Sequence, residues 1–170
     1  MPIPLAEIIV QPLALAPQFC AQVAAWHHQE CERQGLKSTL ALRQQRLQLH
    51  IQGETIPQTL VAVLDEKIIG CVSLVNYHSS TQQKNNGTNL SPVWLSNLFV
   101  QEKHRKQGVG NVLIDHAVNY VRAMAMQELW LSAAEYTEFY QKRGWQISRR
   151  TRLGGRVVNI MRLTLTDIKQ

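Results

Sequence analysis

The sequence predicts a mixed α/β fold, in which strands and helices alternate and a hairpin lies toward each end of the chain. Two apolar runs flank an acidic pair within residues 58–76, which is the pattern of a β-hairpin. Two further runs flank Gly154-Gly155, a two-residue turn that is typical of hairpins. Between the hairpins, Val109–Met126 places apolar residues on one helical face and polar residues on the other. Together these observations favour a sheet flanked by helices.

The strands of this sheet are predicted from short apolar runs bounded by turn residues. They are Ala6–Gln11, Gln58–Leu64, Lys67–Asn76, Val93–Val100, Leu129–Ser132, Trp145–Leu153 and Arg156–Leu165. The polar segment His78–Pro92 separates two of them and is predicted to be a loop.

Three further helices are predicted besides Val109–Met126. Pro17 fits the first turn of one helix, where its missing N–H costs nothing. Ser38 is the expected N-cap of a second helix, which runs to about His50. Tyr136–Arg143 forms a short third helix that ends at a glycine.

Length and composition predict one domain over residues 1–170 with a hydrophobic core of ordinary size. Apolar residues make up 45% and charged residues 18%, and no run approaches the roughly 20 apolar residues that span a membrane. The first ten residues lack the basic flank of a secretory signal. Cys20, Cys31 and Cys71 form no CxxC pair, which indicates reduced thiols in a cytoplasmic protein. Because no apolar run is long enough to span a membrane, no membrane partner is expected.

The formal net charge of +6 attracts nucleic acid, anionic membranes and anionic cofactors alike. One basic cluster is Lys103–Lys106, and a second comprises Arg149, Arg150, Arg152 and Arg156. A nucleic-acid-binding protein is disfavoured, because the first cluster coincides with a glycine turn and no aromatic residues are interleaved with it.

That glycine turn joins the strand Val93–Val100 to the long helix. Gly108 and Gly110 let the backbone approach a ligand, and the first N–H groups of the helix point toward it. An anionic pyrophosphate fits such a place. A dinucleotide-binding turn would carry a third glycine where Leu113 stands, and the Gly-Lys-Ser/Thr sequence of a P-loop is absent.

The same segment resembles the acetyl-coenzyme A signature of the GNAT superfamily. The resemblance rests on Leu98-Phe99-Val100 followed by Arg105-Lys106-Gln107-Gly108-Val109-Gly110. A second element of that family, Phe139-Tyr140-Gln141-Lys142-Arg143-Gly144-Trp145, follows in the family's order. The match covers about Trp94–Trp145 and implies the acyl-CoA N-acyltransferase fold. That fold has a central mixed, mostly antiparallel sheet, splayed at the fourth strand and flanked by about four helices.

The resemblance implies an acetyl-CoA-dependent N-acetyltransferase that transfers the acetyl group directly, without a metal. The backbone of Leu98, Phe99 and Val100 would bind the pantetheine arm. The pyrophosphate would lie in the cradle formed by Arg105, Lys106, Gln107, Gly108, Val109 and Gly110. Tyr140 would act as general acid toward the departing CoA thiolate, since a phenol with a pKa of about 10 can protonate a thiolate.

The sequence also departs from the family pattern. The Glu that the family often carries on the strand before Leu98 is missing, so no general base is assigned, although Glu135 and Glu138 are candidates by proximity to Tyr140. Ala133 stands where many members have Asn or Thr. These departures motivate an alternative, a CoA-binding regulatory or interaction module with weak or no catalysis.

The expected partner is a small-molecule or peptide amine, and a homodimer is also compatible with the sequence. Candidate contacts to the amine are His27, His28 and Glu30 on the first helix and Asn97 on the fourth strand. The spacing of His27 and Cys31 could suit a metal, but no second pair of ligands accompanies it, so no metal site is predicted.

Overall fold

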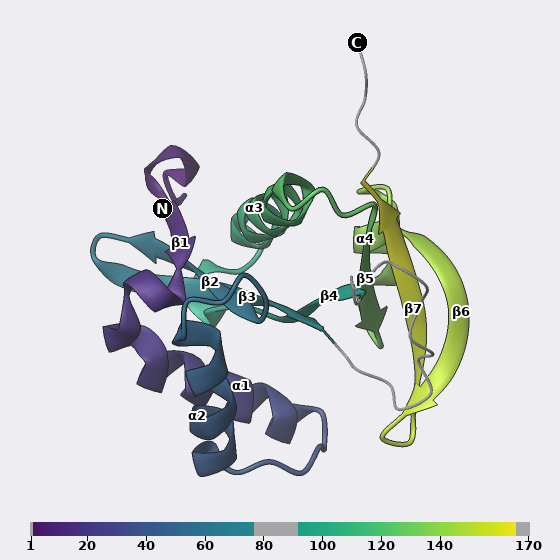
Figure 1. Ribbon diagram of the computed structural model, residues 1–170, viewed down its shortest axis with the longest axis horizontal. Coiled ribbons are helices and arrows are strands. Elements are labelled where there is room, and N and C mark those ends of the chain that lie inside the picture. Colours follow the sequence, from purple (N-terminus) through teal and green to yellow (C-terminus); the bar gives the residue numbers. More distant parts are fainter. Residues whose placement is uncertain (1, 77–91, 166–170) are drawn as a thin grey trace. The chain divides into compact units, whose positions relative to one another are not determined.

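The computed structural model describes residues 2–76 and 92–165 (Figure 1). The chain forms two compact units, each built from two segments. Unit 1 comprises residues 1–74 and 97–117, and unit 2 comprises residues 75–96 and 118–170. The fourth strand and the third helix contribute to both units. The expected loop His78–Pro92 lies outside the described residues except for its last position.

In the described part of the chain, seven strands form one sheet with the order β1-β2-β3-β4-β5-β7-β6. They are β1 Ile9–Pro12, β2 Gln58–Leu64, β3 Lys67–Asn76, β4 Val93–Val100, β5 Glu128–Ala133, β6 Gln146–Leu153 and β7 Arg156–Thr164. The pairs β1–β2, β2–β3, β5–β7 and β6–β7 are antiparallel, whereas β4 pairs with β5 in parallel. The predicted fold class, a mixed and mostly antiparallel sheet with four α-helices, is confirmed.

Within residues 2–76 and 92–165 the α-helices are α1 Cys20–Arg33, α2 Leu40–Gln48, α3 Val109–Ala123 and α4 Thr137–Gln141. Pro17 opens a 3-10 turn directly before α1, as its fixed φ favours. The N-cap of α2 is Thr39, not Ser38, because the extended backbone of Thr39 lets its hydroxyl accept a bond from the Leu42 N–H at 3.1 Å. Ser38 instead lies 3.3 Å from the Nδ1 atom of His28.

Other element ends differ from expectation for local reasons. The first strand begins at Ile9, because Leu5–Glu7 form a 3-10 turn. The helix α3 ends at Ala123, and Ala125 has a left-handed φ of 60°. The helix α4 begins only after Tyr136, whose φ is 64°.

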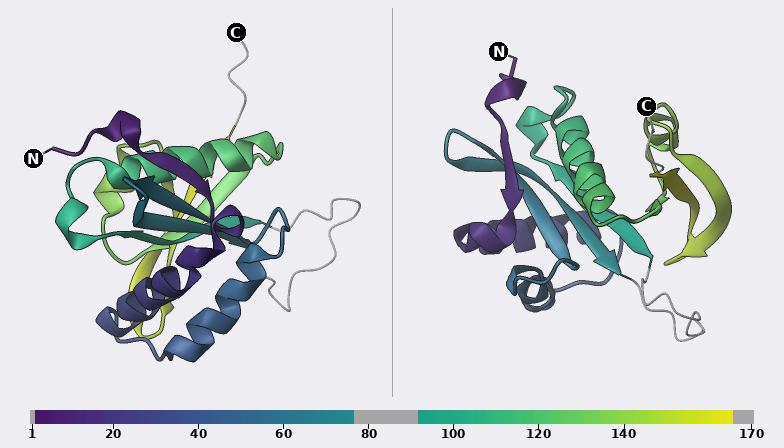
Figure 2. Two further views of the ribbon diagram at one scale, coloured as in Figure 1. Left: turned by 90° about the vertical axis from the view of Figure 1, so that its left-hand side faces the viewer. Right: turned by 45° about the horizontal axis from the view of Figure 1, so that its top comes forward.

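In unit 1, the strands β2 and β3 are buried almost throughout, which explains their continuous apolar runs. Figure 2 shows that α1 and α2 lie on one face of these strands and the start of α3 lies on the other. Gly70 on β3 is required there, because a Cβ would lie 2.7 Å from the Phe99 carbonyl oxygen and 3.0 Å from Leu113 of α3. The core under α1 gathers Leu13, Val23, Ala24, Trp26, Leu47, Val61, Ile68, Cys71 and Phe99.

In unit 2, β5, β7 and β6 form an antiparallel group beside α4. Its buried residues include Leu129, Trp145 and Met161. The edge strand β6 is exposed along almost its whole length, and its arginines face solvent. Such charged edge strands resist pairing with other chains.

Candidate functional site

The strand β4 is interrupted at Asn97, whose φ of 52° lies in the left-handed region. Asparagine tolerates this conformation better than most residues do. Before this position, β4 pairs with β5, and Trp94 lies opposite Trp130. Among the described residues, this is the one position at which the two strands are paired. The Asn97 carbonyl accepts a bond from the Cys71 thiol, with 3.7 Å between sulfur and oxygen. The printed pairing of β4 with β5 therefore lies before Asn97, on the strand where the sequence predicts the splay.

The connection from β4 to α3 forms a turn that suits an anion. Glu102–His104 make one 3-10 turn, and Gly108 follows with a φ of 92°. The first bond of the helical ladder runs from the Val112 N–H to the Gly108 carbonyl. The N–H groups of Val109 and Gly110 precede it and have no acceptor within the helix. Such N–H groups at the positive end of a helix form a phosphate site.

The N-terminal segment supports this turn. The Ile3 N–H donates to the Gln107 side-chain oxygen at 3.0 Å. A Cβ built on Gly108 would lie 3.1 Å from a methyl carbon of Leu5. The positive φ makes any side chain at Gly108 strained, and Leu5 would have to shift slightly to admit one, so this position favours glycine.

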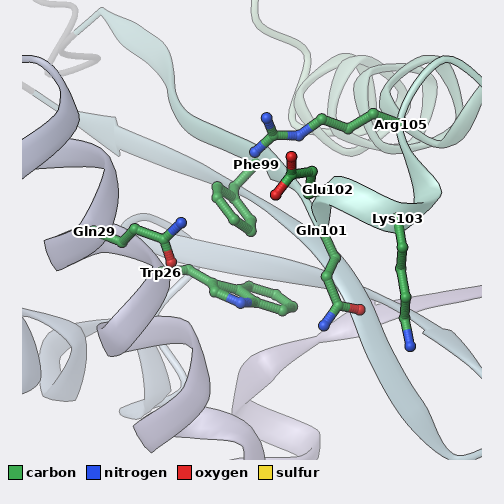
Figure 3. A pocket seen from close by; sticks show the side chains of 7 residues that line it. All are labelled: Trp26, Gln29, Phe99, Gln101, Glu102, Lys103 and Arg105. Atoms are coloured by element: carbon green, nitrogen blue, oxygen red, sulfur yellow. The ribbon is translucent and has the colours of Figure 1, made fainter.

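A cavity of about 610 Å³ lies in unit 1, between α1 and the end of β4. Its lining residues are Trp26, Gln29, Phe99, Gln101, Glu102, Lys103 and Arg105 (Figure 3). The Trp26 and Phe99 rings stack with centroids 5.0 Å apart and an interplanar angle of 28°, and both side chains are buried. The cavity thus combines an aromatic floor with charged and amide side chains above it.

Arg105 lies across the end of β4. Its Nε donates to the Val100 carbonyl at 2.7 Å, and its guanidinium carbon lies 5.4 Å from the centroid of the Phe99 ring. Both contacts hold the guanidinium on the side of β4 that carries the cavity, as Figure 3 shows. A cation over an aromatic face is favourable in this geometry.

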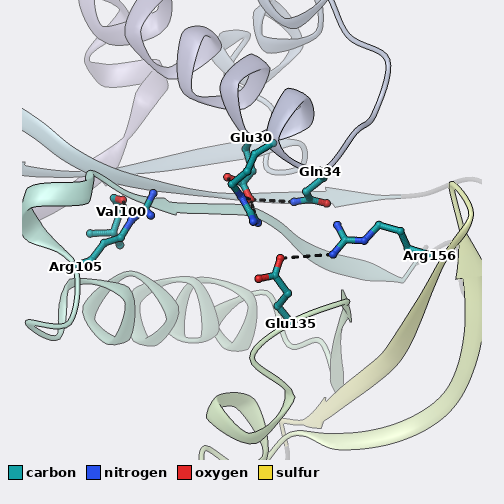
Figure 4. A network of polar contacts seen from close by, with 7 residues as sticks. Glu30, Gln34, Val100, Arg105, Glu135 and Arg156 are labelled. Carbon is teal, nitrogen blue, oxygen red and sulfur yellow. Dashed lines mark hydrogen bonds and ion pairs between the residues drawn. The ribbon is translucent and has the colours of Figure 1, made fainter.

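Glu30 on α1 is held by its neighbours (Figure 4). Arg33 donates to both of its carboxylate oxygens at 2.6–3.1 Å, and the Gln34 side-chain amide donates at 3.0 Å. Burial raises the pKa of Glu30, but these hydrogen bonds and the charges of Arg33 and Arg105 outweigh it and lower the pKa overall. Glu30 is therefore a fixed anion close enough to sense Arg105.

The two histidines of α1 have different surroundings. His27 is only 6% exposed, and its Nε2 lies 4.0 Å from the Cys71 sulfur. Burial, followed by the charges of His50 and Arg43, lowers the pKa of His27 to about 4. His28 is half-buried and forms a 3.1 Å contact with Glu32. Of the two, only His28 has a side chain that a ligand can reach.

Tyr140 lies in unit 2, at the buried face of α4. Its ring meets those of Phe139 and Trp145 edge to face, at centroid distances of 5.2 and 6.0 Å. Burial is the main cause that raises the pKa of Tyr140 to about 12, with Tyr136 adding to it and Arg143 opposing it. The Tyr140 hydroxyl forms no hydrogen bond with another described residue. Its oxygen is also not one of the fully buried, unsatisfied polar atoms of the described residues. The phenol is thus a neutral group with hydrogen-bonding capacity to spare.

The two carboxylates considered as bases also belong to unit 2. Glu135 forms an ion pair with Arg156 at 3.6 Å (Figure 4), whereas Glu138 is exposed in the first turn of α4. Ala133 is buried at the end of β5. Nearby, the Asn159 amide donates to the Thr137 hydroxyl at 3.0 Å, so a polar contact at the start of α4 comes from β7.

Sequence reasoning missed part of the cavity. Gln101 and Glu102 lie between the two parts of the resemblance motif, Leu98–Val100 and Arg105–Gly110, and this position could have indicated their role. Gln29 and Trp26 had no such signal, because the contact of α1 with the end of β4 joins residues more than 70 positions apart.

Among residues 2–76 and 92–165, no helix combines the length and the apolar character needed to cross a membrane. The same residues hold no group of three or more His, Cys, Asp or Glu side chains placed to bind one metal ion.

Residues 56–147 match the family model of the acetyltransferase (GNAT) domain. No curated protein matches the chain. The matched region contains β2, β3, the interrupted strand β4, the glycine turn and α4, and it covers more than half of the sequence.

Solved structures with the same fold are distant in sequence. N-acetylglutamate synthase from Neisseria gonorrhoeae, complexed with coenzyme A and N-acetyl-glutamate, is 18% identical with a TM-score of 0.67. It aligns with 94% of this chain, which spans only 35% of that protein's length. An acetyltransferase of the GNAT family from Streptococcus pneumoniae is 17% identical, with a TM-score of 0.62, and the alignment covers 93% and 99% of the two chains. An aminoglycoside 6'-N-acetyltransferase complexed with coenzyme A is 13% identical, with a TM-score of 0.71. The alignment covers 95% of this chain and 99% of that protein.

Proposed function

This chain belongs to the GNAT acetyltransferase family and is therefore an enzyme of acetyl transfer, and we propose that it moves an acetyl group from acetyl-CoA directly to an amine. The observation that carries the proposal is the left-handed residue Asn97 within β4, followed by a turn in which Gly108 has a positive φ that disfavours a side chain. This arrangement offers backbone groups to an extended donor and helical N–H groups to its phosphates.

The residues present fit acetyl-CoA. The turn Arg105–Gly110 would hold the pyrophosphate through N–H groups and the positive end of α3. The backbone of Leu98–Val100, which follows the interruption at Asn97, would bind the pantetheine arm. When bound, acetyl-CoA supplies an activated thioester carbonyl.

In the proposed step, the neutral amine attacks that carbonyl, a C–N bond forms, and the C–S bond breaks. The departing thiolate takes the proton of the Tyr140 hydroxyl, which later recovers a proton from solvent. Because its pKa is raised to about 12, Tyr140 holds this proton throughout the neutral range. The amine nitrogen loses its extra proton to solvent, and the step needs neither a metal nor a covalent enzyme intermediate.

On the acceptor side, we assign amine contacts to Asn97, Glu30 and His28. Asn97 is exposed at the interruption of β4, and the other two face outward from α1. His27 is not included, because its side chain is buried against Cys71. Proteins of this fold carry names as different as N-acetylglutamate synthase and aminoglycoside acetyltransferase, so the fold leaves the acceptor open between small molecules and peptides.

Calorimetry with acetyl-CoA, combined with a thiol-release assay over a broad panel of amines, tests the proposal. We expect acetyl-CoA to bind and at least one amine to release CoA thiol. The absence of binding at millimolar acetyl-CoA would sink the proposal. Tight binding without turnover on any amine or peptide N-terminus would instead favour the non-catalytic CoA-binding module.

A further inference from the structure

We infer that Cys71 is a positioning residue for acetyl-CoA: its thiol holds the Asn97 carbonyl and thereby sets the direction of the Leu98 N–H. That N–H is the first backbone donor beyond the left-handed position in β4. The inference rests on the proposed binding of acetyl-CoA along Leu98–Val100, and it adds a residue from outside both resemblance motifs. Cys71, Asn97 and Leu98 all belong to unit 1.

The thiol of Cys71 is a buried hydrogen-bond donor. Cys71 lies on β3, the neighbour of β4 in the sheet, and its side chain is fully buried. The thiol donates its one proton to the Asn97 carbonyl, with 3.7 Å between sulfur and oxygen. Burial raises the pKa of this thiol to about 12, so it keeps the proton throughout the neutral range. The donor that holds Asn97 therefore does not titrate near neutral pH.

The buried imidazole of His27 extends this contact into a chain of three groups. Its Nε2 lies 4.0 Å from the Cys71 sulfur. Because the thiol proton is directed at Asn97, His27 supplies the proton of this second contact, which places its ring N–H on Nε2. The two donors then point the same way along the chain, and hydrogen bonds in such a chain strengthen one another.

The planar peptide transmits the hold on Asn97 to the next residue. The Asn97–Leu98 bond is trans, so the Asn97 carbonyl and the Leu98 N–H lie in one plane and point in opposite directions. With the carbonyl directed at Cys71, the N–H is directed away from Cys71. The φ of 52° at Asn97 departs from extended backbone, so regular strand geometry does not by itself set this orientation. The thiol supplies the fixed point.

A role in packing alone is the competing explanation, because Cys71 also belongs to the core under α1. Val61 on β2 provides the matched control. It lies opposite Cys71 in the strand register, is equally buried and belongs to the same core. Its side chain has no polar atom, so it contributes to packing but cannot hold the Asn97 carbonyl.

Three variants separate the hydrogen bond from packing, in calorimetry with acetyl-CoA and in urea denaturation. Cys71→Val fills the space of the thiol with an apolar group, whereas Cys71→Ala leaves it empty. Both remove the donor, so we expect both to raise the Kd for acetyl-CoA by roughly two- to fivefold, whatever their stabilities. Val61→Ala should lose stability and keep the parent Kd.

The infrared S–H stretching band gives a readout that packing does not move. With Cys20→Ser and Cys31→Ser in place, Cys71 carries the one thiol of the chain, and acetyl-CoA itself has none. A hydrogen bond from the Leu98 N–H to the bound donor polarises the peptide and makes the Asn97 carbonyl a stronger acceptor. Without any amine present, acetyl-CoA should therefore shift this band to lower frequency. In a Cys31→Ser, Cys71→Val protein, the band of Cys20 should not shift.

An S–H band of Cys71 that stays in place when acetyl-CoA binds would overturn the inference while leaving the binding of acetyl-CoA intact. So would Kd values that follow stability, with Val61→Ala losing as much affinity as the Cys71 variants. No binding of acetyl-CoA to the parent protein would overturn the proposed function itself, and this inference with it.

Discussion

The indole of Trp26 on α1 stacks on the phenyl ring of Phe99 on β4, with 5.0 Å between ring centroids. This contact joins the first helix to the strand that we propose binds the donor. Trp26→Ala should lower the free energy of unfolding by about 3–5 kcal/mol, because it leaves a large cavity in the core. Urea denaturation would measure the loss. Trp26→Phe, which keeps a stacked ring, should cost clearly less, and equal losses for both variants would contradict the role of stacking.

The left-handed backbone of Asn97 gives a second prediction. Asn97→Val should destabilise the protein by about 1–2 kcal/mol, because a β-branched residue resists positive φ. It should also raise the KM for acetyl-CoA if the strand beyond it binds the donor. Asn97→Gly should retain stability within a few tenths of a kcal/mol of the parent. Ser96→Val, at the preceding position of β4, is the control and should be tolerated.

Tyr140→Phe should lower kcat by roughly 10²–10⁴-fold while leaving the Kd for acetyl-CoA nearly unchanged, because only the proton donor is removed. Since burial raises the pKa of Tyr140 to about 12, the hydroxyl stays protonated below that pH. The rate loss should therefore be uniform from pH 6 to pH 10. Tyr136→Phe, at an exposed position, should be close to neutral. A loss confined to the alkaline range would argue against the acid role.

Gly108→Ala should weaken acetyl-CoA binding in calorimetry, because a Cβ is strained at a φ of 92° and lies 3.1 Å from Leu5. Leu5→Ala in the same protein should restore only part of the affinity, since it relieves the contact but not the backbone strain. Full restoration would show that the contact alone matters.

Buried His27 predicts a dependence of stability on pH. Its folded pKa of about 4 lies below the ordinary 6.5, so only the unfolded chain takes up the proton between these values. Stability should therefore fall as pH drops from 6.5 toward 4, by up to about 3 kcal/mol from this group. His50, whose pKa burial also lowers, acts in the same direction.

Denaturant melts between pH 4 and pH 7 would measure this slope. His27→Gln cannot bind a proton, so the variant should show a visibly flatter dependence whatever its absolute stability. An unchanged slope would contradict the assignment to His27.

Much of the fold follows from local patterns in the sequence. The hairpin of β2 and β3 has the predicted ends, because two apolar runs flank a turn in which Asp65 and Glu66 both take positive φ. The strand β4 and the start of α3 were likewise predicted correctly, since Gly108 marks the boundary. Shorter elements were placed less well, because their ends depend on single contacts such as the Thr39 hydroxyl on the Leu42 N–H.

The candidate site likewise has one part that the sequence predicts and another that only the tertiary structure shows. By itself, the sequence determined the glycine turn that we propose binds phosphate, the family resemblance and the motif that holds Tyr140, because each depends on residues that are neighbours along the chain. The tertiary structure decided that His27 is buried, that Arg105 lies over Phe99, and that the stacked rings of Trp26 and Phe99 line a cavity. These features depend on the packing of α1 against β4, and residues so far apart in the chain meet only through the burial of their shared core.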